Sequence, residues 1–298
     1  MISLFDRRHV RHTFSRFAHT YSAASDLQKD VQMRLLDALA LFEKCNPSVI
    51  ADIGAGTADA CIYLRKRWPK AVIIAIDHAL PMLQQAQHVG WWKKPIQRVA
   101  GNAQTLPLID HSVDLLFSNL CLQWIDDLPQ TFREFRRVLR PGGLLLCSTF
   151  GQRTLDELRQ AFKAADDYPH VMPFQTIMQF GDALVNAGFH QPVIDRDEIC
   201  QTYADFNQLL YAIRAIGATN AMHARRKGLT GRQRFAVAAK AYEAYRRADG
   251  NLVATWEIIY AQAIAPQAGA TIRTEQGDYV SIPIEDIPIR RKPSDPTR

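Results

Sequence analysis

A glycine-rich turn that joins an apolar run to a helical segment constrains the fold of this chain more than any other feature. Residues 49–53 form a short apolar run, and the sequence DIGAGTADA begins at its end, with Asp52. Such a strand-to-helix turn lets a ligand approach the backbone, because Gly54 and Gly56 have no Cβ to exclude it. We therefore expect a ligand site at the carboxyl end of this strand.

The segments around this turn alternate between strand-like and helical patterns. Seven short runs have the character of buried strands: residues 49–53, 71–76, 96–100, 113–117, 144–149, 191–199 and 253–263. Helical spacing occurs between most of them, at residues 60–68, 79–88, 128–139, 154–165 and 176–187. This alternation is typical of βαβ units on a parallel sheet. We predict an α/β fold with a seven-stranded sheet and helices on both faces.

Three stretches depart from this alternation. The N-terminal segment is helical in pattern, because its apolar residues recur at spacings of three and four: Leu27, Val31, Leu35, Leu39 and Phe42. A second helical stretch, with a glycine-rich break at residues 228–231, precedes the last predicted strand, and the C-terminal stretch is polar with an end that we expect to be disordered. The predicted units are a helical segment (1–45), an α/β domain (46–202 and 251–266), a helical insertion (203–250) and a tail (267–298).

Composition and cysteine spacing exclude several classes of protein. Apolar runs such as residues 71–76 fall far short of the roughly 18 residues that a membrane span needs. The N-terminus lacks the apolar stretch of a secretory signal, and the five cysteines are too scattered for a zinc or redox motif. The nine histidines have no metal-binding spacing such as HExxH. We expect a cytoplasmic protein without a bound metal.

The polar residues near the turn indicate a nucleoside ligand without phosphate. Asp59 stands where a dinucleotide-binding loop has its third glycine, and its charge would repel a pyrophosphate. Asp77 ends the second strand, where a carboxylate accepts both ribose hydroxyls, and Asn102 and Ala103 follow the third strand, where they can read an adenine edge. Asp52 favours a positive ligand. S-adenosylmethionine meets these needs, because it combines ribose and adenine with a sulfonium charge.

Four segments, in order and at the usual spacing, resemble class I S-adenosylmethionine-dependent methyltransferases. They are DIGAGTA, the acid-containing IIAIDHALPMLQQA, GNAQTLPLIDHSVDLLFSN and RRVLRPGGLLLCSTF. The resemblance implies a Rossmann-like sheet and a cofactor site formed by Asp52, Gly54, Gly56, Asp77, Asn102, Ala103 and Asn119. Of these, we expect Asn119 to shape the turn after the fourth strand rather than to touch the substrate.

Further segments resemble a narrower family, the malonyl-acyl carrier protein O-methyltransferases of biotin synthesis. They are RHTFSRFAHTYSAASDLQ, CLQWIDD, RAIGATNA, RRKGLTGRQR, TWEIIYAQAIAP and IEDIPIRRK. The resemblance implies methylation of the free carboxyl of malonyl-acyl carrier protein, which disguises it as a chain that fatty acid elongation enzymes accept. It also implies that residues 1–45 cap the cofactor and that residues 203–250 lie on the substrate side.

Two residues depart from the family pattern. The third glycine of the family's loop is Ala58 here, a change that is tolerable if the helix starts there in ordinary α geometry. The family's acid beside the adenine is Asn102, which keeps an acceptor oxygen but loses the charge. We therefore expect a lower affinity for the nucleoside.

The implied reaction needs hydrogen-bond donors rather than a base. A malonyl carboxyl has a pKa of roughly 4, so at neutral pH it is already a nucleophile. Catalysis then reduces to aligning the reactants and excluding water. Our candidates for this role are Tyr21 in the N-terminal cap and Gln123 and Trp124 after the fourth strand. Arg214 and Asn220 could close the other side of the site, since a guanidinium is a natural fork for a carboxylate.

A basic stretch in the insertion indicates an acidic partner. The net charge of the chain is +6, yet residues 225–247 alone contain eight basic residues and one acid. We expect the acidic carrier protein to bind this stretch. The residues expected to contact it are Arg225, Arg226, Lys227, Arg232 and Arg234.

Two alternative functions stay open at this point. A methyltransferase that acts on a small molecule, such as a quinone or phenolic precursor, would need a base or an apolar acceptor pocket. A nucleic-acid-binding protein would need aromatic residues interleaved with the basic ones for base stacking. Phe235, Tyr242 and Tyr245 occur in the basic stretch, but their helical spacing suits core packing. We therefore expect no nucleic acid and no membrane as partners.

Overall fold

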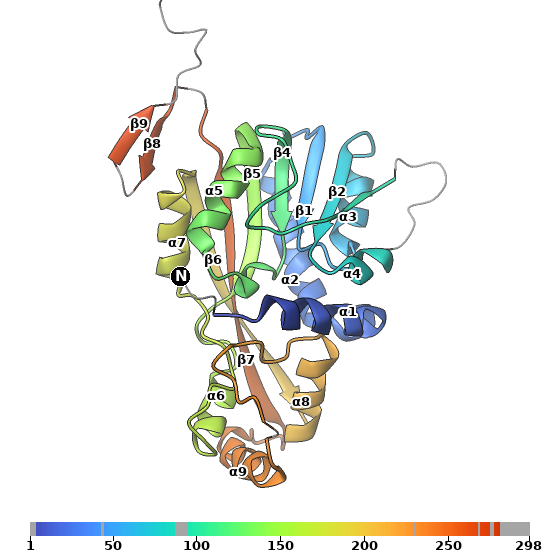
Figure 1. Ribbon diagram of the computed structural model, residues 1–298, viewed down its shortest axis with the longest axis vertical. Coiled ribbons are helices and arrows are strands. Elements are labelled where there is room, and N and C mark those ends of the chain that lie inside the picture. The colour runs from blue at the N-terminus through green and yellow to red at the C-terminus, as the bar shows by residue number, and fades with distance from the viewer. Residues whose placement is uncertain are drawn as a thin grey trace, which may run out of the picture.

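The chain forms a seven-stranded sheet in the order β3-β2-β1-β4-β5-β7-β6 (Figure 1). The computed structural model describes residues 4–42, 45–86, 95–228, 230–267, 269–274 and 277–280. The strands are β1 (Val49–Ile53), β2 (Val72–Asp77), β3 (Gln97–Ala100), β4 (Val113–Ser118), β5 (Leu139–Phe150), β6 (His190–Tyr203) and β7 (Leu252–Ile264). Pairing is parallel from β3 to β5, while β7 is antiparallel to both β5 and β6. The predicted fold class is confirmed.

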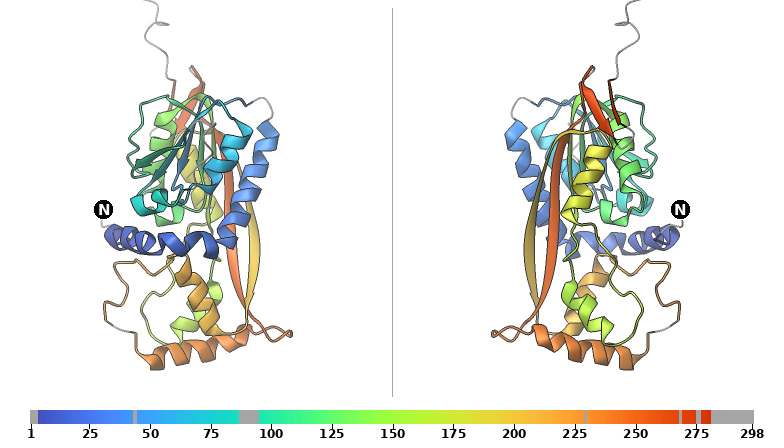
Figure 2. Two further views of the ribbon diagram at one scale, coloured as in Figure 1. Left: turned by 90° about the vertical axis from the view of Figure 1, so that its right-hand side faces the viewer. Right: turned by 90° about the vertical axis from the view of Figure 1, so that its left-hand side faces the viewer.

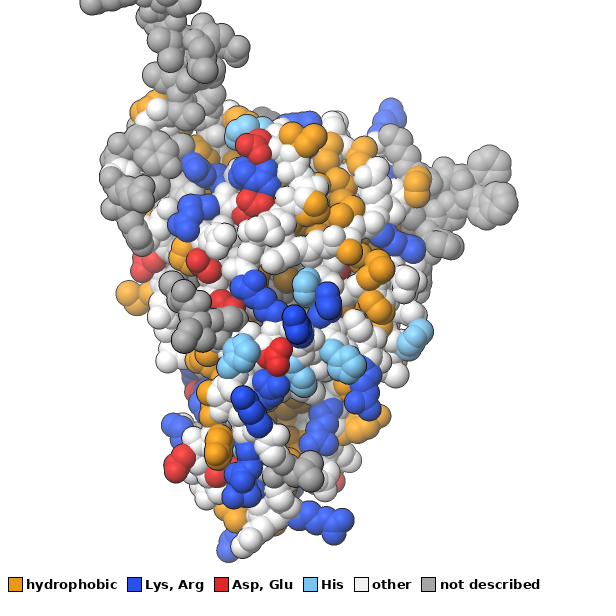
Figure 3. Space-filling view, viewed as in Figure 1, with side chains coloured by type: hydrophobic (Ala, Val, Ile, Leu, Met, Phe, Trp, Pro, Cys, Tyr) orange, Lys and Arg blue, Asp and Glu red, His pale blue; other side chains and the backbone are white. Residues whose placement is uncertain are grey.

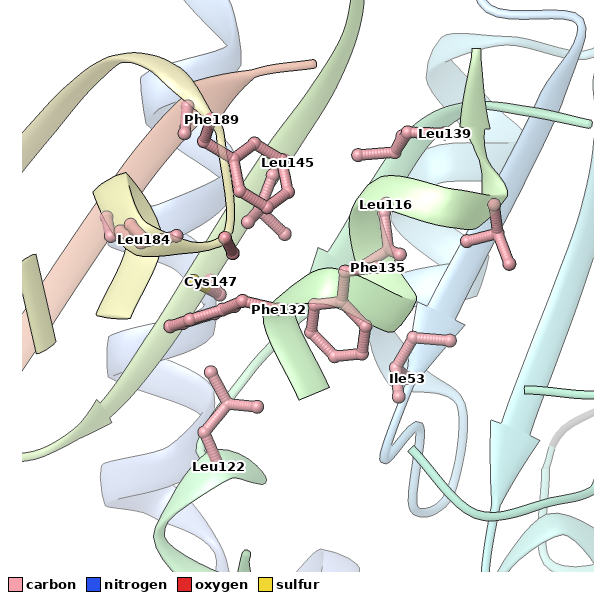
Figure 4. Close-up of a cluster of buried hydrophobic side chains, with 14 of the residues drawn as sticks. Ile53, Leu116, Leu122, Phe132, Phe135, Leu139, Leu145, Cys147, Leu184 and Phe189 are labelled. Carbon is pink, nitrogen blue, oxygen red and sulfur yellow. The ribbon is translucent and has the colours of Figure 1, made fainter. Parts of the chain in front are cut away.

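Helices cover both faces of the sheet because its central strands are apolar on both sides. The helical elements are α1 (Arg7–Ala24), α2 (Asp26–Asp37), η1 (Ala38–Phe42), α3 (Asp59–Arg67), α4 (Leu80–Gln84), η2 (Leu122–Trp124), α5 (Leu128–Val138), α6 (Asp156–Lys163), α7 (Ile177–Asn186), α8 (Phe206–Ala215), α9 (Arg232–Tyr242) and η3 (Glu243–Tyr245). On one face α5 and α7 pack on the strands through Phe132, Phe135 and Leu184 (Figure 4). On the other face α2, η1, α3 and α4 form a second core, in which Leu35, Leu64 and other side chains are buried.

A smaller lobe lies at the carboxyl end of the parallel strands. It contains α6, α8 and α9 around the lower ends of β6 and β7 (Figure 1). Phe162, Leu209, Tyr242 and Trp256 are buried in its core. The sequence places α6 in the α/β domain, but in the structure α6 packs against α9. Its apolar spacing predicts a buried face, and only the tertiary structure supplies the partner of that face.

The N-terminal helix α1 crosses between the sheet and the smaller lobe (Figures 1 and 2). Short segments of the insertion hold the start of this helix in place. The backbone N–H of Asp6 donates to the Ala221 carbonyl over 2.9 Å, and the N–H of His223 donates to the Leu4 carbonyl over 3.0 Å. At Gly217 a Cβ would lie 3.3 Å from the Phe14 ring, so the glycine permits this close packing. The insertion therefore positions α1.

Several boundaries differ from the sequence prediction. β5 begins at Leu139 rather than residue 144, because the Arg-Pro-Gly-Gly segment forms an irregularity within the strand and not a separate turn. Gly142 takes a φ of 77° there. The helix predicted at residues 79–88 is the short α4, and residues 87 and 88 lie outside the described residues. A hairpin of β8 (Thr271–Thr274) and β9 (Gly277–Val280) occurs within the predicted tail, whose end also lies outside them.

Within the described ranges, no helix combines the length and apolar character that a membrane-spanning helix needs.

Candidate active site

A cleft opens where the glycine-rich turn, the end of β2 and α1 meet. The backbone N–H groups of Gly54 and Ala55 donate to the Ile76 carbonyl over 2.8 and 3.0 Å, which fixes the turn against β2. A Cβ at Gly54 would lie 2.3 Å from the Cys121 sulfur, and Gly54 also has a φ of 71°. Glycine is therefore required here both by its backbone conformation and by the space available.

The carboxylate of Asp77 is fixed at the floor of this cleft. One of its oxygens accepts from the N–H of Gly56 over 2.9 Å, and the other accepts from the N–H of Ala79 over 2.7 Å. Burial raises the pKa of Asp77, while these two backbone bonds and a neighbouring histidine favour the ionised form. Each carboxylate oxygen keeps a free lone pair, so the group can accept hydrogen bonds from a vicinal diol. This placement fits the predicted contact with ribose.

A second part of the cleft lies on the other side of the glycine turn and is acidic. Asp52, at the end of β1, is buried there and accepts from the Cys61 thiol over 3.3 Å. Burial raises the pKa of Asp52 to about 7, and the charges of Asp77 and Asp59 add to this effect. Lys29 lines the same region and donates its ammonium to the Ser22 carbonyl. A cationic ligand group near Asp52 would relieve the repulsion between the carboxylates.

The remaining predicted cofactor residues lie along the cleft. Asn102 and Ala103 line it after β3, and the Asn102 side-chain oxygen accepts from the N–H of Gln104 over 3.0 Å. Asn119 lines it after β4, where its amide donates to the Gln28 carbonyl and its oxygen accepts from the Ser148 hydroxyl. Asn119 therefore holds the turn to α2 and β5, as its expected shaping role requires.

Ala58 does not have ordinary α geometry. Its φ of 60° and ψ of 30° are left-handed, so the condition under which the change from glycine is tolerable is not met. The turn needs a left-handed residue before α3 begins at Asp59, whichever side chain stands there. An alanine in this conformation costs roughly 1–2 kcal/mol compared with a right-handed one. Its methyl group is fully buried in the core beside α3.

Aromatic side chains form the wall of the cleft on the α1 side. Tyr21 lines both parts of the cleft, with a ring atom 4.0 Å from where a Cβ of Gly56 would be. Phe14 makes edge contacts with Tyr21 and with Trp124, at centroid distances of 6.5 and 5.4 Å. Burial raises the pKa of Tyr21, and the charges of Asp77 and Asp59 add to it, so the hydroxyl stays protonated. A protonated hydroxyl can donate a hydrogen bond but cannot act as a base.

Three other candidates lie away from the cleft lining. Gln123 follows β4, but its amide donates to the Leu120 carbonyl over 2.6 Å and its oxygen accepts from the Thr149 hydroxyl. Arg214 is exposed on α8 and does not line the cleft. Asn220 donates to the Pro169 carbonyl over 2.6 Å. Among the described residues, those of the insertion support α1 and do not line the cleft.

Several lining residues were not predicted. Val10 and Phe14 lie on the same face of α1 as Tyr21, and their spacing of four and seven residues was the available signal. Arg7 lies at the mouth of the cleft, where its guanidinium is 3.4 Å from the Asp126 carboxylate. His78 directly follows Asp77 and so also lies at this edge of the sheet.

The residues present fit S-adenosylmethionine. Gly54 and Gly56 both line the cleft and carry no side chain, so a ligand can approach the backbone of the turn. Asp77 offers two oriented oxygens to a ribose, and the acidic part around Asp52 suits an ammonium and a sulfonium. Asp59 begins α3, where it disfavours a phosphate-bearing dinucleotide. The carboxylates of Asp52 and Asp77 therefore match a cationic nucleoside.

Comparison with known proteins decides the family. A family model described as "Methyltransferase domain" matches residues 51–147. A malonyl-[acyl-carrier protein] O-methyltransferase of Xylella fastidiosa (strain M23) is 53% identical over 99% of this chain and 100% of the relative. The chain belongs to the malonyl-[acyl-carrier protein] O-methyltransferase family. The family member of Gallionella capsiferriformans (strain ES-2) is 40% identical, over 88% of this chain and 92% of that protein.

A solved structure agrees on the fold of this family member. The YcgJ protein from Bacillus subtilis has a TM-score of 0.57 and is 15% identical, over 79% of this chain and 99% of that one. At this identity the likeness concerns the fold alone. Fold and family membership together confirm the predicted class of enzyme, an O-methyltransferase that uses S-adenosylmethionine.

Asp77→Asn should weaken S-adenosylmethionine binding by about 10- to 1000-fold, because one or two charge-assisted hydrogen bonds of about 1.5–3 kcal/mol each are lost. The amide keeps the size of the side chain and one acceptor oxygen, so it can keep one of the two backbone hydrogen bonds, and circular dichroism checks that the variant is folded. Calorimetric titration measures the affinity, and Asp110→Asn on the surface is the control. An unchanged dissociation constant for Asp77→Asn would remove this residue from the cofactor site.

Binding of S-adenosylmethionine should release a proton from Asp52 in mildly acidic solution. Because the pKa of Asp52 is raised to about 7, its carboxyl is largely protonated at pH 6, and a bound cation favours the ionised form. The affinity should fall roughly five- to tenfold between pH 7.5 and pH 6. Calorimetry at pH 6 in two buffers of different ionisation enthalpy detects the proton. Equal release by wild type and Asp52→Asn would contradict the assignment.

Proposed function

We propose that this protein transfers a methyl group from S-adenosylmethionine to the free carboxyl of malonyl-acyl carrier protein. The product is the malonyl methyl ester that enters pimeloyl and hence biotin synthesis. The named relatives support this proposal, since they match the chain over nearly its full length. The observation of the site that carries it is the position of Tyr21, which lines both parts of the cleft.

The chemistry asks little of the protein beyond positioning. S-adenosylmethionine supplies a methyl group bound to a positively charged sulfur. A malonyl carboxylate needs no deprotonation at neutral pH, so a donor that orients it is more useful than a base. We expect Tyr21 to donate to such a carboxylate, and we expect the rings of Phe14 and Trp124, which pack edge to face on this side of the cleft, to keep water away. We assign α1, within residues 1–45, as the cap of the cofactor site.

The sequence predicts that the acidic carrier protein binds the basic stretch of the insertion, and the contacts of these residues bear on that prediction. Three of the five predicted contact residues have acidic partners within the chain: Arg225 lies 3.2 Å from Asp6, while Arg226 and Arg234 lie 4.0 and 3.2 Å from Asp166. Lys227 and Arg232 are exposed, and within the described residues no ion pair involves them. This stretch therefore offers the partner less charge than its composition indicates.

Labelled methyl transfer to several acceptors tests the proposed function. Malonyl-acyl carrier protein, malonyl-coenzyme A, a phenolic acceptor and RNA are offered in parallel at equal concentration. We expect the carrier-bound malonyl group to be methylated at its carboxyl with the highest kcat/KM. Transfer to the phenol or to RNA, with none to either malonyl thioester, would replace this function by one of the alternatives.

Tyr21→Phe should lower kcat by roughly 10- to 100-fold with little change in S-adenosylmethionine affinity. The ring and its packing stay, whereas one oriented donor is lost from a site with little water. Turnover with malonyl-acyl carrier protein gives the rate. Tyr211→Phe, at a side chain that is 76% exposed, is the matched control. A Tyr21→Phe enzyme with the turnover of the wild type would show that Tyr21 contributes only its ring.

A further inference from the structure

The helix α1 has two faces of opposite character. Positions 10, 13, 14, 17, 18 and 21 form one stripe, which is buried or half-buried and includes the cleft-lining Val10, Phe14 and Tyr21. The opposite stripe is exposed and basic: Arg8, Arg11, His12, Arg16 and His19. The inner stripe is explained by the cleft. The outer stripe does not line the cleft and carries an excess of positive charge.

The outer face of α1 is positive because acids are absent from the helix and neutralised beside it. The helix contains no Asp or Glu. Asp6, which caps it, accepts from the N–H of His9 over 3.0 Å and pairs with Arg225. Asp126 accepts from the N–H of Leu4 and pairs with Arg7. Figure 3 shows Lys, Arg and His side chains gathered over α1 and its surroundings, with few acids among them.

This positive face lies at the mouth of the cleft. Arg7 lines the cleft, and His78 lines it at the end of β2. Burial lowers the pKa of His78, and the charges of Arg11 and Arg7 lower it further, so both guanidinium groups lie near this cleft-lining imidazole. An anionic protein seated on α1 would therefore place an attached acyl group beside the opening. The acyl group is joined to its carrier protein by a covalent arm. The length of that arm limits how far from the opening the carrier protein can bind.

We propose that the outer face of α1, formed by Arg8, Arg11, His12, Arg16 and His19, is the surface that docks the acidic acyl carrier protein; this rests on the proposed function. Charge complementarity identifies the partner, and the position of the face beside the cleft separates it from α9, which carries Arg232, Arg234 and Lys240 of the basic stretch. That stretch is partly neutralised by Asp166, and its helix α9 lies at the far end of the smaller lobe (Figure 1).

The test compares two triple charge reversals. The first is Arg8→Glu, Arg11→Glu and Arg16→Glu on α1, and the matched control is Lys227→Glu, Arg232→Glu and Lys240→Glu in the insertion, with the same change of net charge. All six side chains are exposed and none lines the cleft. The α1 variant should lose about 10- to 100-fold in kcat/KM for malonyl-acyl carrier protein at low salt, and the control less than threefold.

A substrate without a carrier separates docking from chemistry. The malonyl thioester of pantetheine has no protein and no phosphate, so the α1 variant should methylate it within about twofold of the wild-type rate. Salt should slow the wild type with the carrier substrate and leave the pantetheine substrate nearly unaffected. The milder Arg8→Gln, Arg11→Gln and Arg16→Gln variant keeps the helix and should show an intermediate loss. Circular dichroism confirms that each variant is folded.

Binding of the carrier protein is measured apart from turnover, by fluorescence anisotropy. Docking on α1 is overturned if the α1 variant binds the carrier as the wild type does, if both triple variants lose equally, or if the pantetheine substrate suffers as much as the carrier substrate. A wild type that binds the carrier through α1 but methylates neither malonyl thioester supports the docking surface and refutes the proposed function. A wild type that methylates the pantetheine substrate without affinity for the carrier refutes docking alone.

Discussion

The hydrogen bond from the Gly56 backbone to the Asp77 carboxylate holds together the part of the molecule on which the site is built. It joins the turn after β1 to the end of β2, so the two strands present their ends in a fixed relation. Once the turn is fixed, the Cys121 sulfur can pack against Gly54 and the Tyr21 ring can lie over Gly56. A buried carboxylate is costly unless it is paired, and here backbone donors supply the partners.

The helical insertion acts on the site through α1. The chain around Gly217 passes so close to Phe14 that a larger residue would push α1 outward, and Met222 forms a β-bridge with Phe5 at the start of that helix. Packing and a loop contact thus explain the segment RAIGATNA. Gly217 lies against Phe14, the Asn220 side chain bonds to loop backbone, and Arg214 is exposed. Residues that contact no ligand can therefore set the position of Tyr21 and of the aromatic wall.

The sequence sufficed for the parts of the fold that depend on local pattern. The strands and the glycine turn are recognisable because apolar runs, turn residues and the acid at Asp77 lie at short, regular separations along the chain. Cofactor residues at strand ends followed from the same rule, since the ends of parallel strands meet at one edge.

The remaining features depend on contacts that spacing cannot reveal. Arg214 had the right chemistry for a carboxylate, yet its side chain is exposed on α8. The partner of α6 and the left-handed backbone at Ala58 are set by tertiary packing. Likewise, Arg226 forms an ion pair with Asp166, which lies far from it in the sequence.

The long strands β6 and β7 limit how the molecule can move. They pair along almost their whole length, from His190 with Ile264 to Tyr203 with Leu252, and they run through both the sheet and the smaller lobe (Figures 1 and 2). At about 3.3 Å a residue, the fourteen residues of β6 extend through both lobes as one strand. The pairing of β6 with β7 resists bending between the lobes. Hinge closure of one lobe on the other is thus mechanically disfavoured.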